Sequence, residues 1–406
     1  MTGARARAFA ISAIVALVSA LSPAASAADK GTQVTRGKYL ATIGNCAGCH
    51  TAPGGPAFAG GRAIESPFGI FFAPNITPDR KTGIGNWSKR DFWQALHDGE
   101  RPDGSKLYPA CPYPNYTHVR RKDIDAIYAY LRSVPARRHK TPAHILEFPY
   151  SMRSLLPIWQ MLYFEPGVFE NNARRSRTWN RGAYLVQGLG HCDACHADRN
   201  ALGATRTDPN APGDHVHGWY APSLHSSREA GLQRGSIREA ARLLRTGKTD
   251  DTATMGPMAD VVFDSLQYLS PDDVRAMATY LHALADRRVE PARHSATLSK
   301  ARRKALMSTG KTVYEDHCSD CHGASGQGSI AAPPLAGDRT ATLGDPTNLA
   351  NLIRHGGYPP GTTGNPRPFG MRPFPELSDE QVAAVMTFVR ASWGNHAKPV
   401  VPAELP

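Results

Sequence analysis

The sequence predicts an all-α protein of three tandem domains connected internally by long Gly/Pro-rich loops. A five-residue motif of cysteine and histidine occurs three times, and each copy lies between the same two helical patterns. The stretch between the helices is rich in turn-forming residues, with six Gly and five Pro over residues 51–84 in the first copy. A fixed order of motif, loop and helix that recurs along a chain indicates repeated structural units.

The repeated motif is Cys-x-x-Cys-His, the attachment signature for c-type haem. Its two thiols add to the haem vinyl groups, and its histidine binds the iron as the proximal ligand. A structural zinc site would need four ligands from paired units, whereas these motifs lie more than 100 residues apart. We therefore expect three covalently bound haems c. The attachment residues are Cys46, Cys49, Cys192, Cys195, Cys318 and Cys321, and the proximal ligands are His50, His196 and His322.

The helical patterns around each motif set the expected domain boundaries. A helix signal precedes each motif, at Arg36–Leu40, Arg181–Leu185 and, more loosely, Gly310–Tyr314. An amphipathic helix, with apolar residues at i, i+3/i+4 and i+7, closes each repeat over 123–131, 273–281 and 380–389. We expect class I-like cytochrome c domains, linkers between them and an extended Pro-rich tail. The domains span 33–135, 175–286 and 302–396, the linkers 136–174 and 287–301, and the tail 397–406.

The distal ligands are expected just before each closing helix. A methionine thioether is the usual sixth ligand of an electron-transfer haem and raises its potential. In the second repeat the candidate is Met258, with Met255 as the alternative, and in the third repeat it is Met371. The alternative role for these methionines is packing in the hydrophobic core.

The first repeat has no methionine between His50 and Met152, and Cys111 stands at the register position. An axial Cys111 thiolate would stabilise the ferric state and lower the potential of the first haem. Two other interpretations stay open. His118 or His97 takes the sixth position, or the position is open or water-bound and Cys111 is a small hydrophobic residue.

The N-terminus predicts export. Residues 1–27 contain early arginines, an apolar run and a small-residue cleavage site at Ala25–Ala27, which is the pattern of a secretory signal peptide. The net charge of +12 does not indicate nucleic-acid binding in an exported protein. Basic clusters such as Arg137–Lys140 favour either a solvated surface or docking to an acidic partner or anionic lipid. We expect a periplasmic protein, peripherally associated with the outer face of the cytoplasmic membrane.

The first linker contains an apolar, aromatic segment over Ser154–Phe164. Such a segment packs between domains, or it contacts a membrane surface or a partner subunit.

Several segments outside the motifs give the chain a family resemblance. They are Phe72–Asp79, Thr82–Ser88, Leu107–Ala110, Arg181–Val186, Gly190–His196, Arg199–Gly203, Gly256–Ala259 and Arg390–Asn395. In this order they resemble the triheme cytochrome c subunits of periplasmic membrane-bound dehydrogenases, such as those for alcohol and gluconate. The resemblance covers essentially the whole mature chain. Members of the alcohol dehydrogenase type commonly have Met where this chain has Cys111.

The resemblance implies an electron-transfer subunit without substrate chemistry of its own. Its partner would be a dehydrogenase catalytic subunit of the quinoprotein, flavoprotein or molybdenum type. Electrons would pass along the haems to membrane ubiquinone or to a terminal oxidase or cytochrome.

Two enzymatic hypotheses compete with this one. His/Cys-ligated haems c also occur in sulfur-oxidising cytochromes, so the first haem, with His50 and Cys111, would be the catalytic centre for an inorganic sulfur compound. An open first haem would instead suit a peroxidase.

Overall fold

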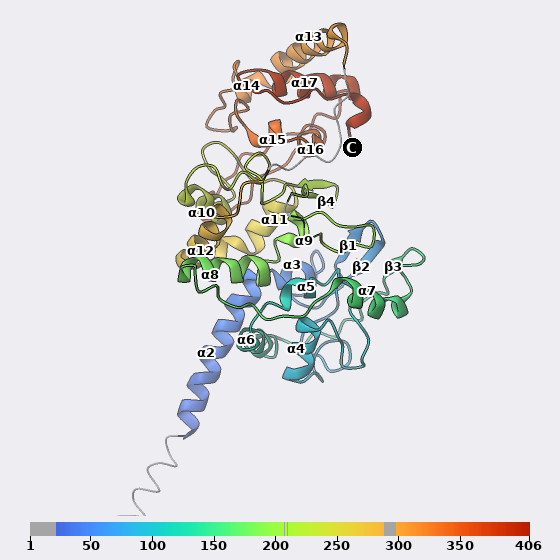
Figure 1. Cartoon of the computed structure of the whole chain (residues 1–406), viewed down its shortest axis with the longest axis vertical. Coiled ribbons are helices and arrows are strands. Elements are labelled where there is room, and N and C mark those ends of the chain that lie inside the picture. The colour runs from blue at the N-terminus through green and yellow to red at the C-terminus, as the bar shows by residue number, and fades with distance from the viewer. Residues whose placement is uncertain (1–21, 207, 209, 288–297) are drawn as a thin grey trace, which may run out of the picture.

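The computed structural model describes residues 22–206, 208, 210–287 and 298–406. Three helical units follow one another in chain order, and the third stands at the far end from the N-terminal helix (Figure 1). Residues 1–21 of the expected signal peptide lie outside the described residues. The prediction of a mainly helical fold is confirmed.

Each unit is a set of short helices joined by loops. The first contains α2 (Ser22–Ile43), α3 (Cys46–His50), α4 (Lys89–His97), α5 (Tyr113–Tyr116) and α6 (Arg121–Leu131). The second contains α8 (Arg177–Tyr184), a π turn (Leu185–Leu189), α9 (Asp193–His196), α10 (Ile237–Thr246), α11 (Pro257–Asp264), a 3₁₀ turn (Leu266–Tyr268) and α12 (Pro271–His282). The third contains α13 (Lys300–His317), α14 (Ser319–His322), α15 (Arg339–Thr342), α16 (Thr347–His355) and α17 (Asp379–Ala391).

The structure also contains two small antiparallel sheets, which the all-α prediction did not include. Strand β2 (Gly69–Phe72) pairs with β1 (Ala63–Ser66) and with β3 (Ile145–Leu146). In the second unit β4 (Asp214–Val216) pairs with β5 (Trp219–Ala221). The sheets lie within the loop regions, where short strands without a long period-2 pattern give little sequence signal.

The first and last helices of every unit cross at a glycine. The pairs are α2 with α6, α8 with α12, and α13 with α17. A Cβ atom on Gly37, Gly182 or Gly310 would overlap a backbone carbonyl oxygen of the partner helix, at Ala126, Ala276 and Ala384 respectively. Only glycine permits so close an approach, and the same contact therefore sets the register of all three units.

A reciprocal network joins the first two units. Arg36 binds Asp123 and Arg181 binds Asp273, one ion pair within each unit. The hydroxyls of Tyr39 and Tyr184 then cross over, so that Tyr39 donates to Asp273 at 2.7 Å and Tyr184 donates to Asp123 at 2.6 Å.

Burial alone would raise the pKa of the Asp273 carboxyl. The hydrogen bonds from Arg181 and Tyr39 outweigh that effect and hold the pKa below its usual value. The network therefore keeps this carboxylate charged at the interface.

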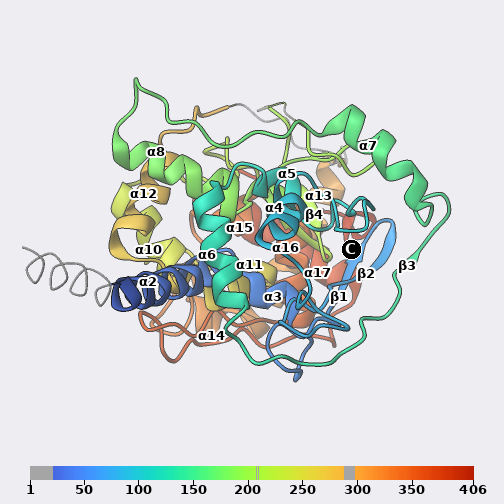
Figure 2. The ribbon, with the colours of Figure 1, turned by 90° about the horizontal axis from the view of Figure 1, so that it is seen from below.

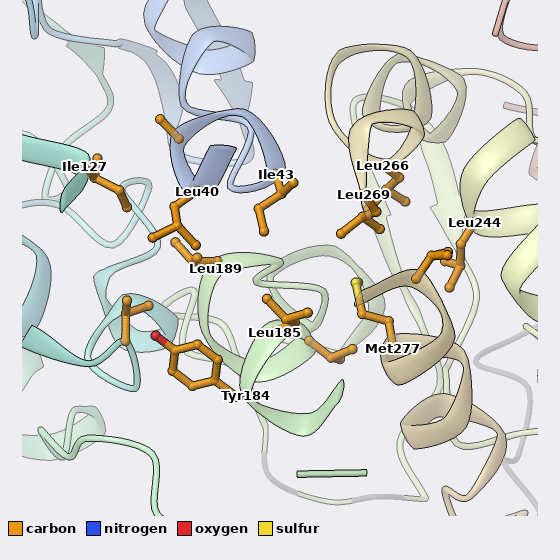
Figure 3. Packing of buried hydrophobic residues seen from close by; sticks show 14 of the residues in the cluster. Leu40, Ile43, Ile127, Tyr184, Leu185, Leu189, Leu244, Leu266, Leu269 and Met277 are labelled. Atoms are coloured by element: carbon orange, nitrogen blue, oxygen red, sulfur yellow. The ribbon is translucent and has the colours of Figure 1, made fainter. Parts of the chain in front are cut away.

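One hydrophobic core serves both of these units. Leu40 and Ile43 of α2 meet Leu185 and Leu189 of the π turn, and the same cluster continues to Met277 on α12 (Figure 3). The third unit has a separate core around Val385 and Met386. The first two units are thus one packed body in the region that the structure describes.

The third unit lacks the residues of the reciprocal network. In register with Gly310, Thr309 replaces the arginine and Gln381 replaces the aspartate. Thr312 stands at the tyrosine position, and Tyr314, two residues further on, donates to the Gly323 carbonyl of its own unit. Contacts with the second unit come from Asn348, which exchanges hydrogen bonds with the Tyr220 backbone, and from an ion pair of His215 with Asp345.

The first linker is structured. Helix α7 (Leu156–Tyr163) runs along the outside of the molecule (Figure 2). Gln160 donates to the carbonyl of Asp98 in the first unit, and the Trp159 indole donates to the carbonyl of Leu202 in the second. Ile158, Met161 and Leu162 are exposed. One face of α7 therefore bridges the two units, and the other is uncovered.

The tail differs in part from its expected extended form. Val400 is buried, and its backbone N–H donates to the Thr387 hydroxyl. A 3₁₀ turn (Pro402–Glu404) follows. The tail packs on the third unit because α17 offers it buried hydrogen-bonding partners.

Gly182→Ala should lower the free energy of unfolding by about 1–3 kcal/mol, the usual cost of overpacking a close contact. The added Cβ would meet the Ala276 carbonyl, which is backbone and cannot rotate away. Gly167→Ala is the control, since nothing lies within 4 Å of a Cβ there. Denaturant unfolding of both variants measures the difference. Equal stabilities would contradict the crossing contact.

Candidate haem sites

Each Cys-x-x-Cys-His motif forms one helical turn after the first helix of its unit. These turns are α3, α9 and α14. The i, i+3 spacing brings the two cysteines of a motif to one face of the turn, and the histidine follows at its end. This arrangement suits two thioether bonds to one porphyrin with the imidazole below the ring.

A backbone carbonyl of a proline holds every motif histidine. The Nδ1 atom of His50 lies 2.7 Å from the Pro74 oxygen, that of His196 lies 2.7 Å from the Pro222 oxygen, and that of His322 lies 3.1 Å from the Pro333 oxygen. Because a carbonyl can only accept, Nδ1 carries the proton in each ring. The lone pair of Nε2 is therefore free to bind iron.

The protonation state agrees with this role. Burial lowers the pKa of His50, His196 and His322, and the bond to the carbonyl only partly offsets it. Each ring is thus neutral at physiological pH, which is the form of imidazole that binds metals.

The second site has a cavity of about 270 Å³. Its lining contains Cys192, Cys195 and His196 together with both candidate methionines, Met255 and Met258. Side chains of all three units contribute to the walls, among them Ile43 from the first unit and Leu343 from the third. Apolar walls with a thioether donor fit an attached haem.

The two methionines of the second site face different neighbours. Met258, on the first turn of α11, packs against the core shared by the first two units. The sulfur of Met255 lies 3.8 Å from the ideal Cβ position of Gly357, a residue of the third unit. This difference supports Met258 as the ligand, which stays a prediction.

The first site brings Cys111 to the attachment cysteines. Burial, and after it a charge on Cys49, raise the pKa of the Cys111 thiol to about 12. A charge on Cys111 likewise raises the pKa of Cys46. Such mutual effects require short distances, so Cys111 lies beside the first motif. Its assignment as the axial ligand stays a prediction.

The two histidines considered as alternatives lie elsewhere. His97 stacks on Trp93 with ring centroids 4.5 Å apart, and its Nδ1 lies 2.7 Å from an Asp98 carboxylate oxygen. The Nδ1 atom of His118 lies 2.9 Å from the Gly167 oxygen, and its charge acts on Asp193 of the second motif. Within the described part of the chain, neither histidine forms a hydrogen bond or ring contact with the first motif.

The third site brings Met371 to its motif. Met371 and Cys318 both pack against the separate core of the third unit. Backbone hydrogen bonds of 2.8 and 3.0 Å with Gly357 fix the loop that carries Met371. Burial raises the pKa of Cys318 to about 11, although the Arg372 guanidinium lowers it, so this loop lies near the motif.

The first and second motifs face each other across the shared interface. Burial raises the pKa of Cys195, and a charge on Cys49 raises it as well. The rings of Tyr116 and His191 lie 5.6 Å apart at the same place. The two attachment sites are therefore neighbours.

Sequence reasoning missed the three proline carbonyls. Each belongs to an Ala-Pro pair, at Pro74, Pro222 and Pro333. The distance along the chain from the histidine is 24, 26 and 11 residues. The recurrence of Ala-Pro after every motif is the signal that could have found them.

Comparison with known proteins places the chain in a family. The family model described as Cytochrome c matches residues 34–135 and 307–393. The gluconate 2-dehydrogenase cytochrome c subunit of Pantoea cypripedii is 39% identical over 96% of this chain and 93% of its own length. The alcohol dehydrogenase (quinone) cytochrome c subunit of Gluconobacter oxydans is 37% identical over 91% and 80%. The fructose dehydrogenase cytochrome subunit of Gluconobacter japonicus is 34% identical over 89% and 79%.

These relatives match along most of their own length, and the resemblance deduced from the sequence is confirmed. The chain belongs to the family of cytochrome c subunits of dehydrogenase complexes.

Proposed function

We propose that this protein is a periplasmic triheme cytochrome c that carries electrons from a dehydrogenase catalytic subunit to membrane quinone or a terminal acceptor. One observation carries the proposal: all three motif histidines have Nδ1 bound to a proline carbonyl and Nε2 free. The shared glycine crossing supports three tandem class I-like cytochrome c domains. The second domain lies outside the two stretches that the family model matches, so its haem rests on the motif and this geometry.

The chain would hold, orient and shield the three haems. Bound haem supplies a one-electron Fe(III)/Fe(II) couple. The cysteines fix each porphyrin, and the proline carbonyls fix the plane of each imidazole. Met258 and Met371 would supply the sixth ligands of the second and third haems, which would exclude substrates there. The walls of the second cavity keep out water and favour the less charged reduced state.

Cys111 makes the first haem different. A thiol with a pKa near 12 is neutral in the protein alone, so binding as thiolate requires the ferric ion to displace its proton. A bound Cys111 thiolate would be an anionic donor that stabilises Fe(III), and it would give the first haem the lowest potential of the three.

The partner is a dehydrogenase catalytic subunit of the quinoprotein, flavoprotein or molybdenum type. The relatives are subunits of gluconate, alcohol, fructose and nicotinate dehydrogenases. Exposed basic residues, including Arg137–Lys140, offer a surface for an acidic partner. The relatives give no support to the sulfur-oxidising alternative, and we do not propose it.

The exposed apolar face of α7, with the residues around it, supports association with a membrane. The exposed apolar residues there are Ile145, Phe148, Met152, Leu155, Ile158, Met161, Leu162, Tyr163 and Val168. No helix among the described residues is long and apolar enough to cross a bilayer. We propose that this patch enters the membrane interface, which would bring the haems close to quinone.

The purified mature chain should carry three covalent haems, as measured by mass spectrometry and by the pyridine haemochrome assay. In the complex isolated from native membranes, gluconate, ethanol, fructose and nicotinate are the first substrates to test for haem reduction. Cys192→Ala with Cys195→Ala should remove one haem. Two haems in the unmodified chain would contradict the proposal. So would isolation of the chain from native membranes without any dehydrogenase subunit.

Cys111→Met should raise the lowest of the three midpoint potentials, because a neutral thioether replaces an anionic donor. The ferric low-spin EPR signal of the first haem should change at the same time. His118→Gln is the control and should leave that potential unchanged. Three similar high potentials in the unmodified protein would rule out the thiolate ligand.

Met161→Ser combined with Leu162→Ser should weaken binding to anionic phospholipid vesicles by at least about tenfold, since burying each apolar side chain contributes about 1.5–3 kcal/mol. Ile330→Ser is the matched control, because Ile330 is 90% exposed but belongs to the third unit. Vesicle co-sedimentation measures both. Unchanged binding of the double variant would exclude α7 as the membrane contact.

A further inference from the structure

Two arginines without an acidic partner meet at the boundary between the second and third units. Arg339 is the first residue of α15, and Arg234 lies in the loop before α10. Both line a polar cavity of about 210 Å³ that also contains Thr249 and Thr252. Neither guanidinium forms a hydrogen bond or ion pair with the residues that the structure describes.

Arg339 extends from the third unit into the second. A Cβ at Gly231, where φ is 67°, would overlap the guanidinium and the Cδ of Arg339. The side chain therefore lies directly against the Gly231 backbone, and glycine leaves the space for it. Arg339 also lines the cavity of the second attachment site, together with Cys192, Cys195 and His196.

The two cavities have a common wall at this point. Arg339, Leu232, Leu243 and Thr252 belong to the walls of both. A porphyrin attached at Cys192 and Cys195 therefore shares its cavity with a guanidinium from a different unit.

No carboxylate of the described residues pairs directly with the Arg339 guanidinium, although Glu239 and Asp251 line the same cavity. Burial lowers its pKa, the carboxylates of Asp338 and Asp251 raise it, and the charge of Arg234 lowers it. The Asp338 carboxylate accepts from the Ala341 N–H at 2.8 Å, and that of Glu239 accepts from Ser236 at 2.7 Å. These acids cap helices, and Asp251 is exposed. Two neighbouring cations without a carboxylate partner make a site for an anion.

The residue just before the capping box differs between the first two units. Ser88 and Asp91 form a capping box at α4, and Ser236 and Glu239 form one at α10, so these helices are in register. Trp87 precedes Ser88 and packs against the shared core, whereas the second unit has Gly235 at that place. Gly235 and Arg339 line the same polar cavity.

We propose that Arg339, with Arg234 beside it, binds a propionate carboxylate of the haem attached at Cys192 and Cys195. The third unit thereby completes the site of the second haem. This inference rests on the proposed haem at the second motif. The propionates are the anionic groups of haem c, and a guanidinium pairs with a carboxylate through two parallel hydrogen bonds.

A positive charge at the propionate favours the reduced state, since Fe(III) carries one more charge than Fe(II). Arg339→Gln should therefore lower one midpoint potential, with the reduction equilibrium falling by about tenfold, or about 59 mV for one electron. Arg234→Gln should lower the same potential by less, and Arg339→Lys should restore most of it. Arg303→Gln is the control, because Arg303 is exposed on α13 and forms no ion pair with the residues that the structure describes.

The experiment is a potentiometric titration of each holoprotein, after a haem count has shown three haems. The component lost in Cys192→Ala with Cys195→Ala identifies the second haem. Three haems with unchanged potentials in Arg339→Gln would overturn the inference and leave the proposed function intact, whereas a missing second haem in the unmodified chain would overturn both.

Two further measurements, the phosphate dependence of the potential and a structure of the holoprotein, test the assignment of the anion. A free anion at this site would make the unmodified potential depend on inorganic phosphate and make Arg339→Gln insensitive to it, which would overturn the propionate assignment. If Arg339→Gln does not fold, a structure of the unmodified holoprotein decides, since Arg339 must lie within hydrogen-bond distance of a propionate oxygen.

Discussion

The close crossing of two helices at a glycine is the contact on which every unit depends. At Gly37, Gly182 and Gly310 the backbones approach so closely that a methyl group would overlap a carbonyl. In every unit the motif turn follows the first helix of this pair. The loop after each motif then brings a proline carbonyl to the histidine.

The three units share this frame and differ in what surrounds it. The first two have an arginine before the glycine and a tyrosine two residues after it, and these residues link the units through Asp123 and Asp273. The third unit has Thr309 and Thr312 at these places, so it keeps its own core and contacts the second unit through polar groups. Together with Gln381 in place of the aspartate, three register positions therefore distinguish the separate third unit from the two that pack as one.

The sequence was sufficient for the family and the helical framework. The motifs are local, and helical periodicity depends on residues close along the chain, so both are visible without a structure. The closing helices expected over 123–131, 273–281 and 380–389 appear as α6, α12 and α17. The ligand assignments of Cys111, Met258 and Met371 remain predictions that the observed positions support.

Features that depend on contacts between residues far apart in the chain could not be predicted from the sequence. The exchange of Tyr39 and Tyr184 joins residues more than 60 positions apart, and no local pattern records it. Two expectations also needed revision for this reason. Segment Ser154–Phe164 was expected either to pack between domains or to contact a membrane surface or a partner subunit; α7 bridges the first two units, and its other face is exposed. Paired strands at β1–β3 and β4–β5 were absent from the all-α expectation because they arise from loop geometry.

The shared core of the first two units has a consequence for cooperativity. Separating them would expose Leu40, Leu185 and Leu189 and leave two aspartates without their tyrosine donors, so neither unit has a low-energy open state of its own. The third unit, with its independent core, forms a distinct cooperative block. Thermal motion therefore leaves the spacing between the first two attachment sites nearly constant. The second and third attachment sites belong to units with separate cores, so the spacing between them is the more sensitive to fluctuation.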